Sequence, residues 1–334
     1  MQPLVLPGLA LGDRVQHELR VIERSEREKR DGERFVILTL GNASGEIATK
    51  PIWANQIADG WVDGAERGAI VQVIGHIASY EANGTSKRQL ALTAPVRLVS
   101  PESARIEEFL PAIEGDITKL WDALDRYRGE IGSVTLQRVL ALFFGDDDFR
   151  LRFERVPASI KGHHAKLGGL LLHVWEVTRI ARGIAQTMRA NVDLVTAGAL
   201  LHDVGKVEAY DVSLGGFART APGYLIEHVV LGCLMLEHRL AALDHPLCTE
   251  EQRLELEHII LSHHGTLEFG SPVRALTLEA EIVHWADESS AKSNDMLESL
   301  GDTGAFGKGE PFAENKRLWR VDNRRLWKRS HSWE

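Results

Sequence analysis

The chain has 334 residues, of which 44% are hydrophobic and 26% are charged. This composition is typical of a folded globular protein with room for two domains, and it argues against a chain that is disordered throughout. The formal net charge of −9 argues weakly against a protein that coats nucleic acid, although a local excess of Lys and Arg can survive a negative total.

The first residues hold only a short apolar stretch, without a basic leader or a small-residue cleavage pattern. The chain also lacks the roughly 18 uninterrupted apolar residues of a membrane helix. We therefore expect a cytoplasmic protein that makes no membrane contact. Cys233 and Cys248 form neither a disulfide framework nor a zinc-binding CxxC pair, so we expect two buried or half-buried thiols.

Residues 14–99 carry five alternating or continuously apolar runs separated by turn formers, which is typical of strands. These runs are RVQHELRVIE, RFVILTLGN, GEIATKPIW, AIVQVIGHIASYE and QLALTAPVRLV. The segment ANQIADGWVDGAERG falls between the third and fourth runs, where an oligonucleotide-binding (OB) barrel carries its helix or long connection. We therefore predict a five-stranded OB-type β-barrel over residues 1–100. Its candidate base-stacking residues, which are more often core in so small a barrel, are Phe35, Trp53, Trp61 and Tyr80.

From Pro101 the apolar residues recur every three or four positions, in EEFLPAIEGDITKLWDALDRYRGEI and in VTLQRVLALFF, and this period predicts helices. We expect residues 101–150 to form a helical connector that ends at the acidic turn GDDDF. Residues 151–334 are predicted to form an all-α helical bundle. The fold class is therefore α+β multidomain, with the barrel first and the bundle after it.

A basic stretch, KRLWRVDNRRLWKRS, lies close to the C-terminus and interleaves tryptophans with Lys and Arg. A packed, solvated tail and a nucleic-acid contact fit this pattern equally well.

Twelve of the 14 histidines follow residue 150. His173 lies in GLLLHVWEVTRIA, a helical pattern whose inward positions are apolar, so it borders a buried face. In GALLHDVGK, His202 and Asp203 end an apolar run, Gly205 marks the end of the helix, and Lys206 lies on the same side as the pair. Core packing would explain each of these positions if it stood alone.

Further along, His228 opens a helix in YLIEHVV, His263 and His264 end the run HIILSHH, and Asp287 follows in EIVHWADESSAK. Together these residues place imidazoles and carboxylates at the inner edges or ends of apolar helices, where burial without partners costs free energy. Metal ions remove that cost. Since no thiolate joins the set, a closed structural zinc site is disfavoured.

The spacing of these residues resembles the HD-domain superfamily of metal-dependent phosphohydrolases, in the form where extra histidines support two metals. The stretches GHHAKLGGLLLHVWEV, LLHDVGK and HIILSHHGTLEFGSPV look like YhaM-type 3′-to-5′ exoribonucleases, which join an N-terminal OB domain to a C-terminal HD domain. The resemblance covers nearly the full chain, including DNRRLWKR. It departs at DESSAK after the last aspartate and at the long charged turn ERSEREKRDGER. We expect neither departure to touch a metal ligand.

The residue types then predict two divalent ions per chain that clamp a phosphate and activate water for in-line attack. Manganese is the first choice, with Co, Fe, Ni, Zn and Mg as alternatives. We assign His173, His202, Asp203 and Asp287 to one ion and His228, His263 and His264 to the other, with Asp203 as the bridge. The catalytic residues are predicted to be Asp203, His202 and Lys206.

Substrate contacts are predicted around this centre. Lys206 is expected to neutralise a phosphate oxygen or to protonate the leaving 3′-oxygen, with a helix cap as the alternative role. His163 and His164 precede the first catalytic helix, where free backbone N–H groups suit an anion. The resemblance implies that the loop holding Glu268 and Ser271 shapes the nucleotide pocket.

The predicted function is a metal-dependent 3′-to-5′ exonuclease that hydrolyses single-stranded RNA, with single-stranded DNA left open, to 5′-mononucleotides. One alternative is an HD phosphohydrolase of small nucleotides whose OB domain serves regulation or assembly. Another is a non-enzymatic protein that binds single-stranded nucleic acid. The barrel favours the first, because a strand-holding module helps only a polymer substrate. Assembly into a homo-oligomer stays open.

Overall fold

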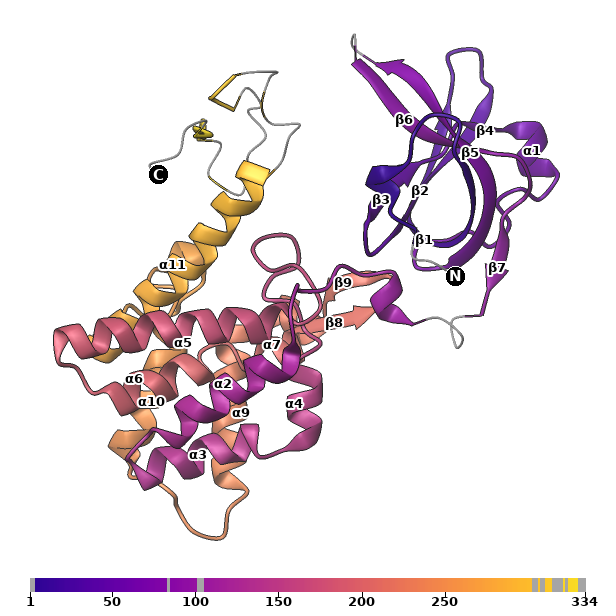
Figure 1. Cartoon of the computed structure of the whole chain (residues 1–334). Coiled ribbons are helices and arrows are strands. Elements are labelled where there is room, and N and C mark those ends of the chain that lie inside the picture. The colour runs from indigo at the N-terminus through magenta and orange to yellow at the C-terminus, as the bar shows by residue number, and fades with distance from the viewer. Residues whose placement is uncertain are drawn as a thin grey trace. The chain divides into compact units, whose positions relative to one another are not determined.

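The computed structural model describes residues 4–82, 85–100, 105–301, 306, 310–313, 321 and 324–329. The chain divides into two compact units (Figure 1). The first contains the residues up to Ala112 together with Val212–Ala218, and the second contains Ile113–Asp211 and the residues from Arg219 onward. Within the described ranges, no helix is both long enough and apolar enough to span a membrane.

The first unit is a curved antiparallel sheet, with strand order β3-β2-β1-β5-β6, β4 paired to β2, and β7 paired to β5 (Figure 1). A short helix, α1 (Ala54–Ala58), follows β4. It lies in the segment ANQIADGWVDGAERG, where the sequence analysis expected a helix or a long connection. The strands are β1 (Arg14–Glu28), β2 (Arg34–Asn42), β3 (Gly45–Ala48), β4 (Ile52–Trp53), β5 (Ile70–Ala82), β6 (Thr85–Leu92) and β7 (Arg97–Val99).

The observed strands differ from the five predicted ones at two prolines. Pro51 separates β3 from β4 and Pro95 separates β6 from β7, because proline has no N–H to donate to a ladder. The charged segment predicted as a long turn is mostly strand, since Glu28 still pairs with Arg34. Next to the edge strand β3, Thr49 forms an isolated parallel bridge with Leu90 of the other edge strand, β6. Among its described residues the structure therefore shows a curved sheet whose edge strands do not pair along their length to close a barrel.

The core of this unit follows the two-residue period of its strands. In β2, Val36, Leu38 and Leu40 are buried, while the residues between them are partly exposed. Trp61 packs against this core, and Tyr80 is exposed.

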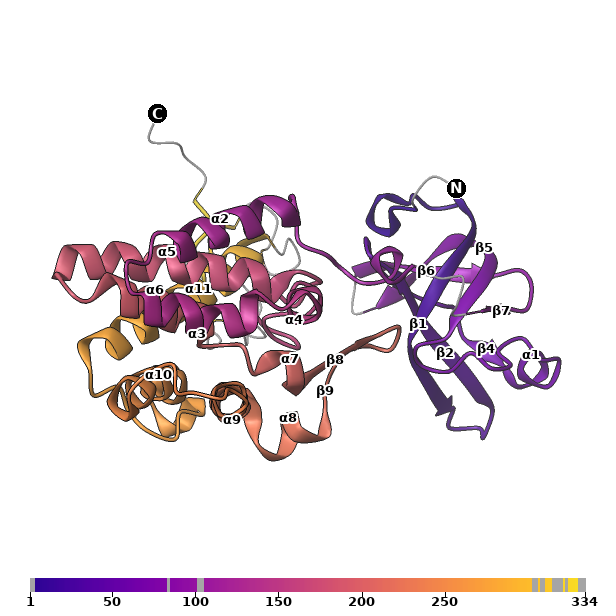
Figure 2. The ribbon, with the colours of Figure 1, turned by 90° about the horizontal axis from the view of Figure 1, so that it is seen from below.

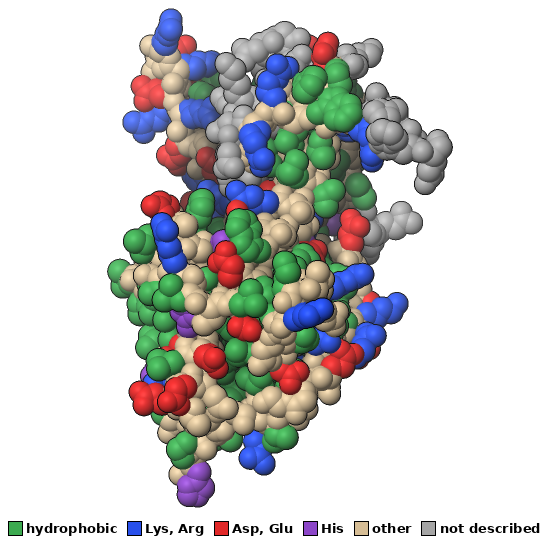
Figure 3. Space-filling model, turned by 90° about the vertical axis from the view of Figure 1, so that its left-hand side faces the viewer, with side chains coloured by type: hydrophobic (Ala, Val, Ile, Leu, Met, Phe, Trp, Pro, Cys, Tyr) green, Lys and Arg blue, Asp and Glu red, His purple; other side chains and the backbone are tan. Residues whose placement is uncertain are grey.

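On the face of the molecule in Figure 3, acidic and basic side chains are interspersed among hydrophobic ones.

The second unit is a helical bundle. A small hairpin, β8 (Tyr210–Ser213) and β9 (Gly216–Arg219), interrupts its helices, and the prediction of an all-α region missed it. Tyr210, Asp211 and Arg219 belong to the second unit, whereas Val212–Ala218 are grouped with the first. Helices α5, α6 and α11 pack against one another (Figures 1 and 2). Its helices are α2 (Ile117–Gly129), α3 (Val134–Phe144), α4 (Asp147–Phe153), α5 (Gly169–Met188), α6 (Val192–Leu201), α7 (Lys206–Ala209), α8 (Ala221–Leu225), α9 (Glu227–Ala241), α10 (Glu250–Ser262) and α11 (Leu278–Gly301).

Local sequence signals explain the helices that position the site. Asn191 caps α6 by accepting a hydrogen bond from the Leu194 N–H, and every residue from Leu194 to Leu201 is buried. A helix that is apolar on all sides belongs in the centre of a bundle. Residues directly after Leu201 therefore emerge inside the unit.

The predicted basic stretch lies partly outside the described residues, which omit Lys316, Arg317 and Arg320. In the described part, Leu326 is buried in a small cluster with Ala313 and Val321, whereas the Trp327 side chain is half exposed.

Candidate metal centre

The bundle brings together the seven side chains that the sequence analysis nominated as metal ligands. They form two groups, and within each group one ligand atom per residue lies within 4.8 Å of the others. The first group is His173 from α5, His202 from the end of α6 and Asp287 from α11; the second is Asp203 after α6, His228 from α9, and His263 and His264 after α10.

Asp203 lies between the two groups and is fully buried. Its Oδ2 is 3.4 Å from His173 Nε2 and 3.3 Å from His202 Nε2. Its Oδ1 is 3.4 Å from His228 Nε2 and 3.6 Å from His263 Nε2. One oxygen therefore faces each group, which is the geometry that a bridging carboxylate requires.

Four of the five histidines are held by hydrogen bonds at Nδ1, which leaves Nε2 to face the centre. The acceptors are Ala199 O for His202 (2.7 Å), Ile260 O for His263 (2.7 Å), Phe269 O for His264 (2.6 Å) and Ser290 Oγ for His173 (3.1 Å).

The donor atoms fit divalent metal ions. His173 Nε2 lies 3.4 Å from His202 Nε2, and His228 Nε2 lies 3.3 Å from His264 Nε2, so lone pairs face each other unless a proton or cation stands between them. Asp203 Oδ1 and His263 Nε2 are buried and make no hydrogen bond to any described residue, which is costly for polar atoms. Imidazoles and carboxylates without thiolates suit Mn, Fe, Co, Ni or Zn.

Charge is distributed unevenly between the groups. Burial disfavours a charged His173, but the carboxylates of Asp203 and Asp287 outweigh it and raise the pKa of His173 to about 9. In the other group, burial lowers the pKa of His228 to about 4 and that of His263 to about 3. These two imidazoles are neutral at pH 7 and can bind a metal without releasing a proton.

The two carboxylates are ionised despite their burial. Burial alone would raise the pKa of each, yet Lys206 and His202 hold the pKa of Asp203 well below its usual value. The bond to His173 does the same for the pKa of Asp287. Lys206 Nζ lies 2.6 Å from Asp203 Oδ2, and that contact outweighs burial and raises the pKa of Lys206.

A hydrogen-bonded chain supports His173 from behind. His173 Nδ1 donates to Ser290 Oγ, and Ser290 in turn donates to Glu176 Oε2 at 2.6 Å. Asn294 Nδ2 also donates to this carboxylate, at 2.8 Å. Ser290 belongs to the segment DESSAK, so the expectation that this departure touches no proposed ligand is wrong.

Glycines allow two close approaches at the site. Gly205 has φ −65°, so it is no left-handed helix end, but a Cβ there would lie 2.0 Å from the His228 carbonyl oxygen. Gly265 has φ +79°, and a Cβ there would lie 2.4 Å from the His284 ring. His284 Nδ1 donates to the His263 carbonyl at 2.8 Å, so it braces the segment that carries His263 and His264.

A cavity of about 270 Å³ opens beside the two groups. It is lined by Ala158, Ser159, His163, Lys206, Tyr210, Arg219, His228, His264, Phe269, Asp287, Glu288 and Ala291.

Some of the predicted substrate contacts line this cavity and others do not. Lys206 and His163 line it, and His163 Nε2 is buried with no hydrogen-bond partner in the part of the chain that the structure describes. His164 instead lies against Glu176, with 3.0 Å between Nε2 and Oε2. Glu268 is exposed, and Ser271 is buried with no partner for its hydroxyl among the described residues. Neither residue lines the cavity.

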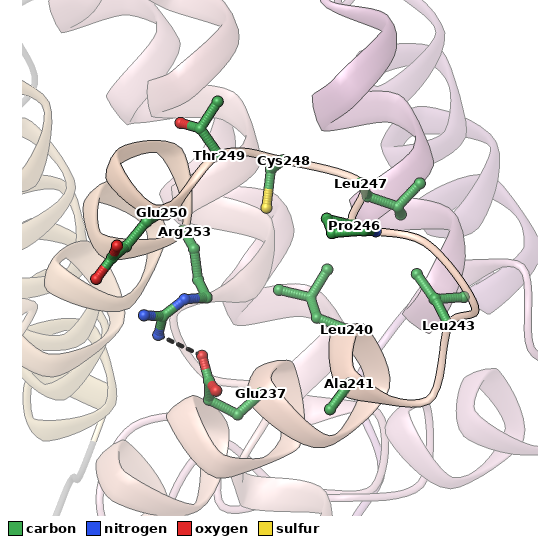
Figure 4. Close-up of a pocket in the computed structure, with 10 residues that line it drawn as sticks. All are labelled: Glu237, Leu240, Ala241, Leu243, Pro246, Leu247, Cys248, Thr249, Glu250 and Arg253. Carbon is green, nitrogen blue, oxygen red and sulfur yellow. Dashed lines mark hydrogen bonds and ion pairs between the residues drawn. The ribbon is translucent and has the colours of Figure 1, made fainter.

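A second hollow, of about 310 Å³, lies between the end of α9 and the start of α10 (Figure 4). Leu240, Leu243 and Pro246 supply an apolar side, and Arg253 is paired with Glu237 on the other. Cys248 also lines it, and burial raises the pKa of this thiol. Both cysteines are free and partly buried, as predicted.

The helical bundle and its paired ligand groups are those of an HD-domain protein, and the HD domain family model matches residues 170–292. The 3′-5′ exoribonuclease YhaM of Bacillus licheniformis is 30% identical over 324 residues, covering 95% of this chain and 96% of that protein. The YhaM of Bacillus subtilis is 29% identical over 321 residues, with the same coverage. That of Oceanobacillus iheyensis is 30% identical over 325 residues, covering 95% of each. The chain therefore belongs to the YhaM family.

Proposed function

We propose that this protein is a metal-dependent 3′-to-5′ exoribonuclease that hydrolyses single-stranded RNA to 5′-mononucleotides. The observation that carries the proposal is the pair of ligand groups that share Asp203 beside an open cavity. The relatives named 3′-5′ exoribonuclease span nearly the whole chain and support the same activity.

The ligands in this proposal are the seven nominated residues, with Asp203 shared between two ions. Bound there, a pair of divalent ions supplies Lewis acidity to the scissile phosphate and to the attacking water. Manganese remains the first choice of metal. Because hydrolysis by activated water needs no side-chain nucleophile, the chain forms no covalent intermediate with its substrate.

Lys206 and His163 do the remaining work on the phosphate. The Lys206 ammonium lines the cavity beside Asp203, where it neutralises charge on a phosphate oxygen or donates its proton to the leaving 3′-oxygen. Burial, followed by the charge of His173, holds the pKa of His163 well below its usual value, so its imidazole is neutral. Its unpaired Nε2 then makes a hydrogen bond to the substrate.

The β unit is proposed to be an OB-type barrel that holds the strand. Phe35 and Trp53 lie with ring centroids 5.1 Å apart, and Lys29 Nζ stands 3.9 Å from the centroid of Trp53. Aromatic rings flanked by a cation are the elements from which single-strand binding surfaces are made. This pair is the candidate strand contact, ahead of the core-packed Trp61.

The test is the product ladder of end-labelled RNA and DNA, with and without added Mn. We expect stepwise shortening from a free single-stranded 3′ end, release of 5′-mononucleotides, and arrest near the base of a stable stem. A chelator should stop the reaction, and Mn should restore it. Internal cleavage, 3′-phosphate products or equal cleavage of a circular strand would contradict the proposal and favour a phosphohydrolase of small nucleotides.

A further inference from the structure

The cavity extends beyond the proposed metal ligands to two residues at the base of the small hairpin. Tyr210 begins β8, Arg219 ends β9, and the two strands pair. Directly beyond them, the Thr220 N–H donates to the Ala209 carbonyl at 2.9 Å. The hairpin therefore holds Tyr210 and Arg219 side by side, and both line the cavity.

Tyr210 offers an unused hydrogen-bond donor. Only 9% of the residue is exposed, yet its hydroxyl makes no hydrogen bond within the described part of the chain. Burial raises the pKa of the phenol, so the hydroxyl keeps its proton at neutral pH. A buried tyrosine normally finds a partner for this group. Since Tyr210 lines the cavity, a molecule in the cavity can accept this hydrogen bond.

Arg219 is held in place and keeps donors to spare. One of its guanidinium nitrogens, Nη1, pairs with Glu227 Oε1, and 35% of its side chain is exposed. The guanidinium carbon lies 5.9 Å from the centroid of the Tyr224 ring. A guanidinium has several N–H donors in one plane, so others remain for a ligand.

Glu227 connects this arginine to the proposed metal centre. Its φ is +67°, a left-handed conformation that is strained for a residue other than glycine. Its second oxygen lies 3.7 Å from His228 Nδ1. The carboxylate that pairs with Arg219 therefore lies beside a proposed ligand without hydrogen bonding to it, which places Arg219 close to the ligand groups.

We propose that Tyr210 and Arg219 bind the phosphate next to the scissile one, on its 5′ side. The inference rests on the proposed function, in which the scissile phosphate lies at the ligand groups and Lys206. The terminal nucleotide carries no phosphate besides the scissile one, so further phosphate donors in the cavity meet the next phosphate upstream. An arginine and a phenol suit this role because both donate to an anionic oxygen.

A site for the upstream phosphate should favour substrates that carry this second phosphate over substrates with the scissile phosphodiester alone. A matched substrate pair tests it: the dinucleoside monophosphate ApA and its 5′-phosphorylated form pApA share one scissile bond and differ only in the upstream phosphate. We expect the wild-type protein to prefer pApA in kcat/KM. Arg219→Ala should lower kcat/KM for pApA by roughly 10-fold or more, since a charge-assisted hydrogen bond is lost, and should leave that for ApA nearly unchanged.

Two further variants complete the experiment. Tyr210→Phe removes only the hydroxyl and keeps the ring, so it should lower kcat/KM for pApA by roughly 5-fold without harming the fold. Arg179→Ala is the matched control, because Arg179 is an exposed arginine of the same unit whose guanidinium lies 5.5 Å from the Trp175 ring, away from the cavity lining. This variant should keep the wild-type preference.

The proposal is overturned if Arg219→Ala and Tyr210→Phe slow ApA and pApA equally, if they slow neither, or if the wild-type protein shows no preference for pApA. Failure of the proposed function gives a different result, because the wild-type protein would then shorten no RNA from its 3′ end at all.

Discussion

Two clusters of acidic side chains in the helical unit shift their carboxylate pKa values in opposite directions. Around Asp203 and Asp287, imidazoles and Lys206 outweigh burial and hold both carboxylate pKa values well below normal. In the second cluster, Arg253 is the cation between Glu237 and Glu257. There, burial and the neighbouring Glu237 outweigh the arginine and raise the pKa of Glu257 to about 7.

The difference lies in the ratio of cations and imidazoles to carboxylates. A metal ion needs donors that are already deprotonated, so a cluster that keeps its carboxylates ionised is ready to bind one. A cluster in which one arginine serves two carboxylates holds a proton instead. Burial of acidic residues is therefore no sign of a metal site unless their neighbours keep them charged.

The largest expected effect is at the shared carboxylate. Asp203→Ala removes the one residue that faces both ligand groups, so both ions and RNA hydrolysis should be lost. Metal content by mass spectrometry and hydrolysis of end-labelled RNA measure the two losses. Asp244→Ala, at an exposed loop aspartate, is the control and should behave as wild type. Full activity in Asp203→Ala would rule out the HD-type centre.

Single ligands should separate the two halves of the centre. His173→Ala and His264→Ala each remove one imidazole from one group, so each variant should lose about one of the two ions and more than roughly 100-fold in activity. Excess Mn should restore part of the activity of each, because three ligands of the affected ion remain when Asp203 is shared. Loss of both ions in both variants would show that the groups act as one site.

An intermediate effect is expected at Ser290, which accepts from His173 Nδ1 and donates to Glu176. Ser290→Ala should weaken metal binding or activity by roughly 10-fold to 100-fold, the usual cost of losing a partner behind a ligand. Ser290→Thr, which keeps the hydroxyl, should recover most of it. Titration with Mn measures the affinity, and unchanged affinity in Ser290→Ala would reduce this serine to a packing role.

Local patterns predicted much of the fold. The run VTLQRVLALFF coincides with α3, and the β region was predicted because alternation is visible within each strand. The hairpin β8–β9 was missed because its strands are short, although the turn formers Gly215 and Gly216 between apolar residues were a usable signal. Barrel closure depends on contacts between distant strands, which no local period encodes.

The candidate ligands were predictable for a related reason: each lies at the inner edge or at an end of an apolar helical run. Their partners were not. Ser290 meets His173 across 117 residues of chain, and Tyr210 meets Arg219 through a hairpin that the sequence analysis did not foresee. Such contacts are made by packing of α5 against α11 and of β8 against β9, so they become visible only in the folded chain.

The smallest effect is expected in the second cluster, and it is an effect of pH on stability. The folded protein holds the Glu257 proton up to about pH 7, whereas an unfolded glutamate releases it near its ordinary pKa of 4.5. The stability contributed by this group is therefore complete below about pH 4.5 and is lost as the pH rises through 7. Glu257→Gln keeps the neutral form at every pH, so its melting temperature relative to wild type should increase between pH 5 and pH 8. Thermal unfolding of both proteins at the two pH values measures this change, with Glu255→Gln, an exposed glutamate of the same helix, as the control. An equal difference between variant and wild type at both pH values would mean that Arg253 keeps Glu257 ionised, as Lys206 and the imidazoles do for Asp203.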